Sequence, residues 1–454
     1  MEDKRIYTLK DAPVTKAIFK MTMPVVAGMM IQILYNLVDT FFISQLGDPN
    51  QLAAANLTMP VFMIMMAIAS IIGTGAASYI SRCLGEKDYS QANRTLSTGI
   101  AICVGLGIII TILGYVFLSP LMYALGSSPA TFPFAKDYSS VLFLGSVFIM
   151  CNYAIGQLLR SEGAVMPSII GMMIGTVANI ILDPLFIFGF NMGIRGAAIA
   201  TVIGNALGLL YYVVYYAKGK SIVKFSIKCI AFSKEIMKQI FGIGLPAALS
   251  QLLMSVAMII CNNLLAAYGD TVVAGYGVAY KIMSIGTFVF MGFAAGCQPL
   301  TGYNYGAKNL PRLKEIIKKA MLFTFLIGVG IFAIFGIFAA PLVGVFSTNM
   351  PEVERYGISM LRALMWLLLV LGIQLLCTTT IQAFGKIKAA LFLSIARQGL
   401  FFIPLLFIMN NLIGLNGVIY AQPLADGLTF IVALLVLRHT MKQIEQSMQH
   451  PQEV

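Results

Sequence analysis

The sequence predicts an all-α polytopic membrane protein with twelve transmembrane helices, in two six-helix bundles related by a parallel pseudo-two-fold repeat. Three observations support this fold: long apolar runs, a composition with 59% hydrophobic and 11% charged residues, and features that recur about 222 positions apart. Soluble domains carry about a quarter charged residues, and apolar runs of 18 or more residues are long enough to span a bilayer. We therefore expect the chain to lie in lipid.

Each long apolar segment predicts one helix. The first such segment is too long for a cleaved signal peptide, so we expect it to be retained as the first transmembrane helix. The predicted helices cover residues 17–45, 53–81, 96–118, 140–160, 166–189, 194–217, 239–268, 272–302, 318–340, 357–384, 388–410 and 414–437.

The net charge is +12, and the basic residues that produce it are concentrated on one predicted side of the membrane. Of the 30 lysines and arginines, 24 fall in the tails and in one alternating set of connections, and three fall in the other set. This imbalance follows the positive-inside rule and predicts that both termini are cytoplasmic in a multi-pass protein of the cell (inner) membrane. The basic charge thus indicates orientation and contact with membrane lipids, not binding of nucleic acid.

Loop residues repeat with an offset of 221 or 222, which indicates a duplicated half. The matched features are Pro24 with Pro246, Gly47-Asp48 with Gly269-Asp270, Gly85-x-Lys87 with Gly306-x-Lys308, Gly163 with Gly385, and Gly193-x-x-Gly196 with Gly414-x-x-Gly417. We expect an N-terminal lobe over 1–217, a cytoplasmic linker over 218–238 and a C-terminal lobe over 239–454. Because alternating access can use two bundles that rock about a central site, this plan favours a transporter.

Charged residues within predicted helices are costly in lipid and are functional candidates. Asp39, Asp183 and Thr201 each lie six or seven residues from the outer end of their helices. At about 1.5 Å per residue, all three should lie about 9–11 Å below those ends. Three polar groups on three helices are therefore expected at one level.

The helical period adds further oxygen atoms to this level. Asn179 is four residues before Asp183, and Ala197 is four before Thr201, so each pair shares a helix face. Pro184 favours a bend and frees the carbonyl of Ile180. Such an all-oxygen group suits Na+ or a proton shared by two carboxylates. The alternative is that each aspartate only caps a kink or bonds a neighbouring helix.

Uncharged polar and aromatic residues on two predicted helices suit a cavity for weakly polar organic molecules. These candidate substrate-binding residues are Gln32, Tyr35, Asn36, Asn152, Tyr153 and Gln157. Methionines such as Met29 and Met66 could form an adaptable wall for such a cavity, although methionine is also ordinary filler in membrane helices.

The second half carries Lys281, Arg397 and Asp426 within predicted helices, and Asp426 matches Asn205 by the repeat offset. These three could form a structural ion-pair network or contact substrate. The seven cysteines include no C-x-x-C pair, and the two histidines lie near the C-terminus. The residues therefore predict no catalytic site, no cofactor and no metal site beyond one for Na+.

Several motifs resemble the multidrug and toxic compound extrusion (MATE) family, in particular its bacterial branch of DinF and MepA type. They are Met23-Pro24, the run Tyr35-Asn36-Leu37-Val38-Asp39-Thr40, Asn179-x-x-x-Asp183-Pro184, Gly-Ala-Ala at 196–198 before Thr201, and Gln298-Pro299-Leu300 followed by Tyr303-Asn304-Tyr305-Gly306-Ala307-Lys308. The resemblance covers nearly the whole chain.

This resemblance implies a monomeric antiporter that exports amphiphilic organic cations in exchange for H+ or Na+. It implies a cation site formed by Asp39, Asp183, Asn179, Thr201 and the carbonyl of Ala197. Protonation there would be coupled to bending of the first helix, for which Pro24 is the candidate. The alternative is a lipid-linked oligosaccharide flippase of the same superfamily, which Lys281 and Arg397 leave open. A membrane enzyme has little support.

Overall fold

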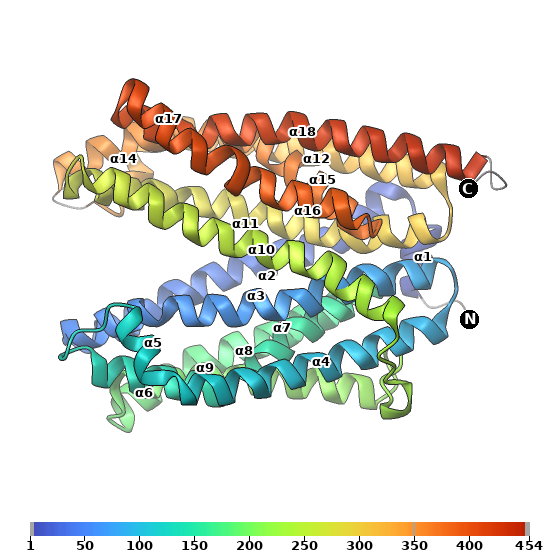
Figure 1. The fold of residues 1–454 in the computed structure, drawn as a ribbon, viewed down its shortest axis with the longest axis horizontal. Coiled ribbons are helices and arrows are strands. Elements are labelled where there is room, and N and C mark those ends of the chain that lie inside the picture. Colours follow the sequence, from blue (N-terminus) through green and yellow to red (C-terminus); the bar gives the residue numbers. More distant parts are fainter. Residues whose placement is uncertain (1–3, 348–349, 450–454) are drawn as a thin grey trace. The chain divides into compact units, whose positions relative to one another are not determined.

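A computed structural model describes residues 4–347 and 350–449, and all regular elements among them are helices (Figure 1). Eleven helices are long and apolar enough to cross a membrane, and one bent helix pair brings the number of spans to twelve. The predicted all-α membrane fold is thus confirmed. Seven of the twelve predicted helices agree with the observed spans to within five residues at each end, because long apolar runs leave few alternatives. The third, ninth and tenth begin six to eight residues earlier than predicted, and the last continues to Gln449 and not only to 437, because these extensions are polar and carry no apolar signal.

Helices α1 to α9 precede the predicted linker. Their bounds, with one π-helical turn, are α1 Lys4–Lys10, α2 Val14–Ser44, α3 Pro49–Gly85, α4 Tyr89–Val116, α5 Leu118–Ala124, α6 Phe132–Leu144, α7 Ser146–Ser161, α8 Val165–Pro184, η1 Leu185–Gly189 and α9 Gly193–Ala217.

The remaining elements follow a short 3-10 turn, η2 Ile227–Cys229, in the linker. They are α10 Lys234–Ala266, α11 Asp270–Gly306, α12 Leu310–Ile337, α13 Ala339–Gly344, α14 Pro351–Leu364, η3 Met365–Leu367, α15 Leu368–Ala383, α16 Ile387–Ile395, η4 Ala396–Phe402, α17 Ile403–Ile413 and α18 Leu415–Gln449. Elements α14, η3 and α15 together make one span, as do α16, η4 and α17.

The chain divides into two compact units whose boundaries differ from the expected lobes. The first unit contains residues 1–6 and 27–244, and the second contains residues 7–26 and 245–454. The prediction placed 1–217 in one lobe and 239–454 in the other, with 218–238 as a linker. The difference arises because α2 and α10 each contribute one end to each unit.

Both changes of unit occur beside the duplicated prolines. Pro24 lies inside α2 two residues before the change at 26–27, and Pro246 lies inside α10 two residues after the change at 244–245. Each proline removes one hydrogen bond from a helix that continues through it. The duplication thus preserves a weakened point at the same place in each repeat.

The repeated loop residues share an unusual backbone conformation, a positive φ angle, which gives a physical reason for finding the same residues in both repeats. Lys87 and Lys308 have φ of 63° and 53°, and Gly163 and Gly385 have φ of 81° and 70°. Positive φ also occurs at the repeat pairs Gly47 with Gly269 and Gly193 with Gly414. Left-handed positions strongly favour glycine, so the glycines of these turns are costly to replace in either half; the paired lysines adopt the same conformation without that advantage.

The fourth predicted helix, residues 140–160, is wrong in its start and in its shape. The structure has α6 and α7, joined at Gly145 with a bend of 54°. A Cβ at Gly145 would lie 2.2 Å from Val202 Cγ2, so only glycine allows the bend to approach α9 this closely. The sequence prediction missed α6 because this bend depends on packing against a helix distant in sequence.

Helices α8 and α9 pack along each other through glycines. A Cβ at Gly204 would lie 2.6 Å from the carbonyl oxygen of Gly175 and 3.2 Å from Asn179 Cβ. Such small-residue contacts let the backbones of membrane helices approach closely. This approach places polar residues of α8 beside those of α9.

The linker is bound to the first unit by backbone amides. The amide of Lys224 donates to Asn93 Oδ1 (2.6 Å), that of Ser226 to Ser97 Oγ (3.1 Å), and that of Ala231 to Thr98 Oγ1 (2.9 Å). The polar side chains at the start of α4 thus hold this segment in place.

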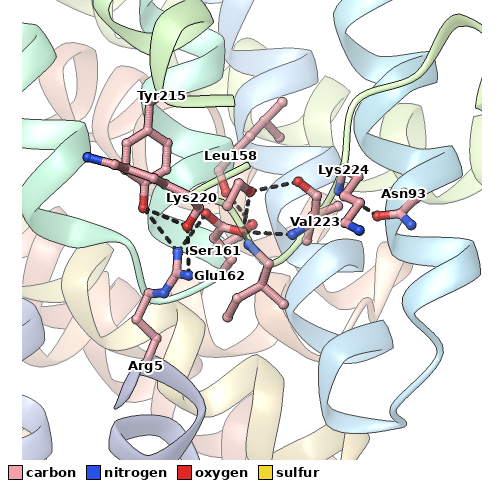
Figure 2. A network of polar contacts seen from close by, with 11 residues as sticks. Arg5, Asn93, Leu158, Ser161, Glu162, Tyr215, Lys220, Val223 and Lys224 are labelled. Carbon is pink, nitrogen blue, oxygen red and sulfur yellow. Dashed lines mark hydrogen bonds and ion pairs between the residues drawn. The ribbon is translucent and has the colours of Figure 1, made fainter. Parts of the chain in front are cut away.

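Glu162, just after α7, anchors the start of the linker (Figure 2). Its Oε2 accepts hydrogen bonds from Ser221 Oγ (2.7 Å) and from the amides of Ile222 (2.9 Å) and Val223 (3.0 Å), and its Oε1 pairs with Arg5 Nη1 at 3.3 Å. Burial raises the pKa of this carboxyl, and the four bonds it accepts oppose that effect. A fully buried carboxylate thus joins α1, α7 and the linker.

We expect Gly204→Ala to lower stability, because its methyl group would force α8 and α9 apart. Overpacking of this kind costs about 1–3 kcal/mol. The change is checked by the melting temperature of the purified protein in detergent. Gly105→Ala is the control, since a Cβ there meets nothing within 4 Å. Equal melting temperatures for both variants would contradict this account of the α8–α9 contact.

We expect Glu162→Gln to lower the melting temperature by several degrees, because one amide oxygen cannot serve both Arg5 and the three linker donors. Leaving buried partners unsatisfied costs about 1–3 kcal/mol. The matched control is Glu445→Gln, which breaks the exposed pair with Lys314 (2.7 Å) and should cost less than about 1 kcal/mol. A larger loss in the control would refute the anchoring role of Glu162.

Candidate functional site

Two acidic residues from separate helices meet inside the first unit. Asp39 on α2 and Asp183 on α8 lie with their carboxyl groups within hydrogen-bonding range of each other. Asp183 is fully buried, and the Oδ1 atoms of both residues are buried without a partner among the described residues. Two carboxyl groups can bond directly only when a proton lies between them.

Asn179 and Thr201 complete this polar group, at the position that the helical period predicts. In the amide orientation that satisfies both neighbours, Asn179 Nδ2 donates to Asp183 Oδ2 at 2.9 Å. Its Oδ1 then accepts from the Thr201 amide (2.9 Å) and from Thr201 Oγ1 (3.3 Å). The side chain of Thr201 also lies within hydrogen-bonding range of Tyr35.

Ala197 lies one turn before Thr201 on α9 and is fully buried. Its side chain packs in a small apolar cluster with Ile43 and Ile187. This cluster brings α9, α2 and η1 together beside the carboxyl pair. The apolar neighbours keep the surroundings of the aspartates poor in water, which strengthens electrostatic interactions there.

The sequence predicted a bend at Pro184, and the structure has an irregular turn that begins one residue later. Pro184 is the last residue of α8, and the π-helical turn Leu185–Gly189 follows it directly. Turns of this type are frequent at functional sites. At Pro24, by contrast, α2 continues through the proline as one α-helix.

A cavity of about 110 Å³ lies next to the carboxyl pair, within the first unit. Four predicted substrate-binding residues line it, namely Gln32, Tyr35, Asn152 and Tyr153, and so do Asn179 and Thr201. Met29 and Met66 form part of its wall. Polar residues of the carboxyl site are therefore also walls of the cavity.

Two other predicted residues do not contribute to this lining. Gln157 packs its side chain against the backbone of α3 at Gly73, where a Cβ would lie 3.1 Å from Gln157 Cγ. The side chain of Asn36 lies outside the described residues.

Asn205 connects the cavity wall to the carboxyl site. Asn152 Nδ2 donates to Asn205 Oδ1 (3.0 Å), and Asn205 Nδ2 donates to the carbonyl oxygen of Thr201 (2.8 Å). Its repeat counterpart Asp426 has a different environment in the second unit.

The charged residues of the second half form a pair and not a group of three. Arg397 Nε donates to Asp426 Oδ1 at 2.7 Å, and Gln422 Nε2 donates to Asp426 Oδ2 at 2.8 Å. Asp426 is fully buried, and Arg397 lies on the π-helical turn Ala396–Phe402. Lys281 is exposed on α11 and takes no part in this pair. The second unit thus neutralises its buried charge internally.

Sequence reasoning missed two residues near this site. Tyr138 on α6 is close enough to Asp39 and Asp183 to interact with them electrostatically, and it was excluded because the predicted fourth helix began at residue 140. Arg160 was counted with the loop after that helix, yet it is buried and lines the cavity. Arg160 was itself the last residue of the predicted helix 140–160, so a charge at that helix end was the available signal.

Comparisons with known proteins agree with this geometry. The MatE family model matches residues 24–185 and 246–408, one match in each repeat. The multidrug export protein MepA of Staphylococcus aureus (strain NCTC 8325 / PS 47) is 35% identical over 437 residues, covering 96% of each chain. MepA of Staphylococcus saprophyticus is 32% identical over the same length and coverage.

Solved structures show the same fold. One, described as the outward-facing conformation of a multidrug resistance MATE family transporter, has a TM-score of 0.93 at 29% identity and covers 98% of this chain and 100% of that one. A transporter of the MOP superfamily from Pyrococcus furiosus has a TM-score of 0.92 at 29% identity, with 98% and 99% covered. This chain is a multi-pass membrane protein that belongs to the MatE (MATE) family of transporters.

Proposed function

We propose that the protein is a proton-coupled antiporter that exports amphiphilic organic cations by alternating access. The direct contact between the carboxyl groups of Asp39 and Asp183 is the observation that supports this most strongly. In a site poor in water, two carboxylates cannot both stay ionised at this separation unless a cation joins them. The pair is therefore suited to take up and release one coupling ion per cycle.

The coupling ion and the substrate are linked through shared residues. Asn179 bonds Asp183, Thr201 bonds Asn179, and both line the cavity. When the pair loses its proton, it becomes negative and attracts a cationic substrate. When a proton returns, the attraction is lost and the substrate is released. This competition for one negative site makes transport an exchange.

The proposed substrate class is supported by the residues that line the cavity and by the names of the related proteins. Its wall combines amides, tyrosines and methionines, which can accommodate molecules of varied shape. The relatives at 32–35% identity are named multidrug export proteins. Export of a monovalent cation against a potential of 100 mV costs about 2.3 kcal/mol, so the exporter requires ion coupling.

Orientation follows from the distribution of basic residues. With both termini cytoplasmic, the carboxyl pair lies toward the extracellular ends of α2 and α8. Protons would then enter the pair from outside and leave to the cytoplasm, down the gradient across the cell membrane. The protein is proposed to act as a monomer, since the first unit by itself contains both the carboxyl pair and the cavity.

Replacement of either aspartate by asparagine should abolish transport without unfolding the protein. We expect efflux of ethidium from cells that express Asp39→Asn or Asp183→Asn to fall to the level of cells without the transporter. Asp48→Asn is the control, because it removes an equally negative group from an exposed helix cap, where asparagine caps equally well. Wild-type efflux in Asp39→Asn, at equal amounts of folded protein, would rule out the proposed coupling site.

Purified protein in liposomes should move ethidium in response to a proton gradient alone. A Na+ gradient alone should have no effect, because the direct carboxyl contact accommodates a proton and leaves no room for a larger ion between the two groups. Transport is followed by ethidium fluorescence with each gradient imposed separately. Transport driven by Na+ and not by protons would replace the proton with Na+ as the coupling ion.

A further inference from the structure

The cavity of the first unit contains an arginine that the proposed coupling does not use. Arg160, near the C-terminal end of α7, is 7% exposed and lines the cavity. A positive charge beside a site for cations is unexpected. Burial of an ionised group is costly unless it is paired, so the partner of this guanidinium decides its role.

Among the residues that the structure describes, Arg160 has one hydrogen-bonded neighbour and no ion pair. Its Nη1 donates to Ser168 Oγ at 3.1 Å, and its Nε is buried without a partner. The titratable groups close enough to act on it are the phenols of Tyr153 and Tyr212. Neither of these residues is a carboxylate, the usual counter-ion of a guanidinium.

Three buried or partly buried carboxyl groups of the first unit, on or next to α7, α8 and α2, are engaged elsewhere. Glu162, two residues further along the chain, is occupied by Arg5 and the linker. Asp183 lies on the same helix as Ser168 but fifteen residues later, which corresponds to about 22 Å along the axis. Asp39 is in contact with Asp183 and lies at that distant end. Arg160 therefore has no counter-ion among residues 4–347 and 350–449, which the structure describes.

The cavity extends between these two oppositely charged ends. The residues of α8 that line it are Met172, Gly175, Thr176 and Asn179. They lie between Ser168, which contacts Arg160, and Asp183. The cavity therefore has the carboxyl pair near one end and a guanidinium near the other.

The surrounding contacts hold Arg160 in place. Ser168 Oγ donates to the carbonyl of Gly156 (2.7 Å), and Tyr212 Oη donates to the carbonyl of Ser168 (2.6 Å). Both Gly156 and Tyr212 also line the cavity. A charged group held by such contacts binds a ligand with little loss of side-chain entropy.

We propose that Arg160 is an anion-binding subsite of this cavity and takes the carboxylate of a zwitterionic amphiphile. The planar guanidinium of an arginine binds carboxylates through paired N–H groups, and the one hydrogen bond that the structure gives Arg160, to Ser168 Oγ, leaves donors of its five N–H groups for such a ligand. This inference rests on the proposed export function and assigns to Arg160 the recognition of an acidic group on a transported molecule. Phosphate of a lipid headgroup shares this chemistry, and the experiment below separates the two sources.

The test uses two dyes that differ by one ester. Rhodamine 110 carries a free carboxylate, and rhodamine 123 is its methyl ester. Binding of each dye to the purified protein in lipid-free detergent is measured by fluorescence polarisation. We expect Arg160→Gln to weaken binding of rhodamine 110 relative to rhodamine 123 by about tenfold. The ratio of the two Kd values is decisive, because damage to the fold affects both dyes equally.

Two further variants separate charge from structure. Arg160→Lys keeps the positive charge and should restore part of the preference for rhodamine 110. Arg82→Gln is the control, because Arg82 is a buried arginine of the same unit that bonds Gln239 Oε1 (2.9 Å) and does not line the cavity. Its ratio should match that of the wild type. An unchanged ratio in Arg160→Gln, or an equal loss for both dyes, would overturn the proposal.

Lipid is distinguished by addition of an anionic phospholipid to the wild-type assay. If a headgroup phosphate is the natural occupant, that lipid will displace rhodamine 110 and an uncharged-headgroup glycolipid will not, which overturns the assignment to a transported carboxylate. If the proposed export function is wrong but the subsite exists, the results will differ from these. Liposomes with the wild-type protein would then transport neither dye, while binding of rhodamine 110 would still depend on Arg160.

Discussion

The contact between two carboxyl groups in a water-poor setting is the interaction on which the site depends. Asp39 and Asp183 lie on helices separated by most of the first repeat, so the contact exists only while α2 and α8 stay in register. The close glycine contacts of α8 and α9 add Asn179 and Thr201 to the pair. A change in the charge of the pair therefore acts on three helices at once, since all three contribute a bonded group.

The two repeats share a plan but treat buried charge differently. In the second unit, Arg397 and Asp426 neutralise each other. In the first, the residue equivalent to Asp426 is the neutral Asn205, and the residue equivalent to Arg160 in the second is Gln382. One repeat thus contains a closed ion pair, whereas the other has a buried carboxyl pair beside a cavity that an arginine lines. The duplication supplied two similar bundles, and divergence of a few side chains distinguished them.

Much of this could be predicted from the sequence, because apolar length and helical period are local properties. They placed the apolar parts of the long helices and brought Asp39, Asp183, Asn179 and Thr201 to one level, but they missed the polar extensions of several helices, such as that of α18 to Gln449. Features that depend on packing were not accessible. The bend at Gly145 lies where the backbone approaches Val202 on α9, and the helix before the bend, α6, carries Tyr138, which lies near the aspartates. The assignment of residues 7–26 to the second unit likewise depends on contacts made far along the chain.

The division of α2 and α10 has a consequence for the independence of the two halves. Residues 7–26 pack with the second unit, where a Cβ at Gly296 would lie 2.6 Å from Thr22 Cα and Asn304 Nδ2 bonds the carbonyl of Leu9 (3.0 Å). A chain cut within the linker would leave each fragment without part of its own interior. Each half thus supplies one end of a helix to the other unit. The same exchange of segments occurs in domain-swapped dimers, here within one polypeptide. An ancestral single repeat that paired with a copy of itself would already have had this exchange.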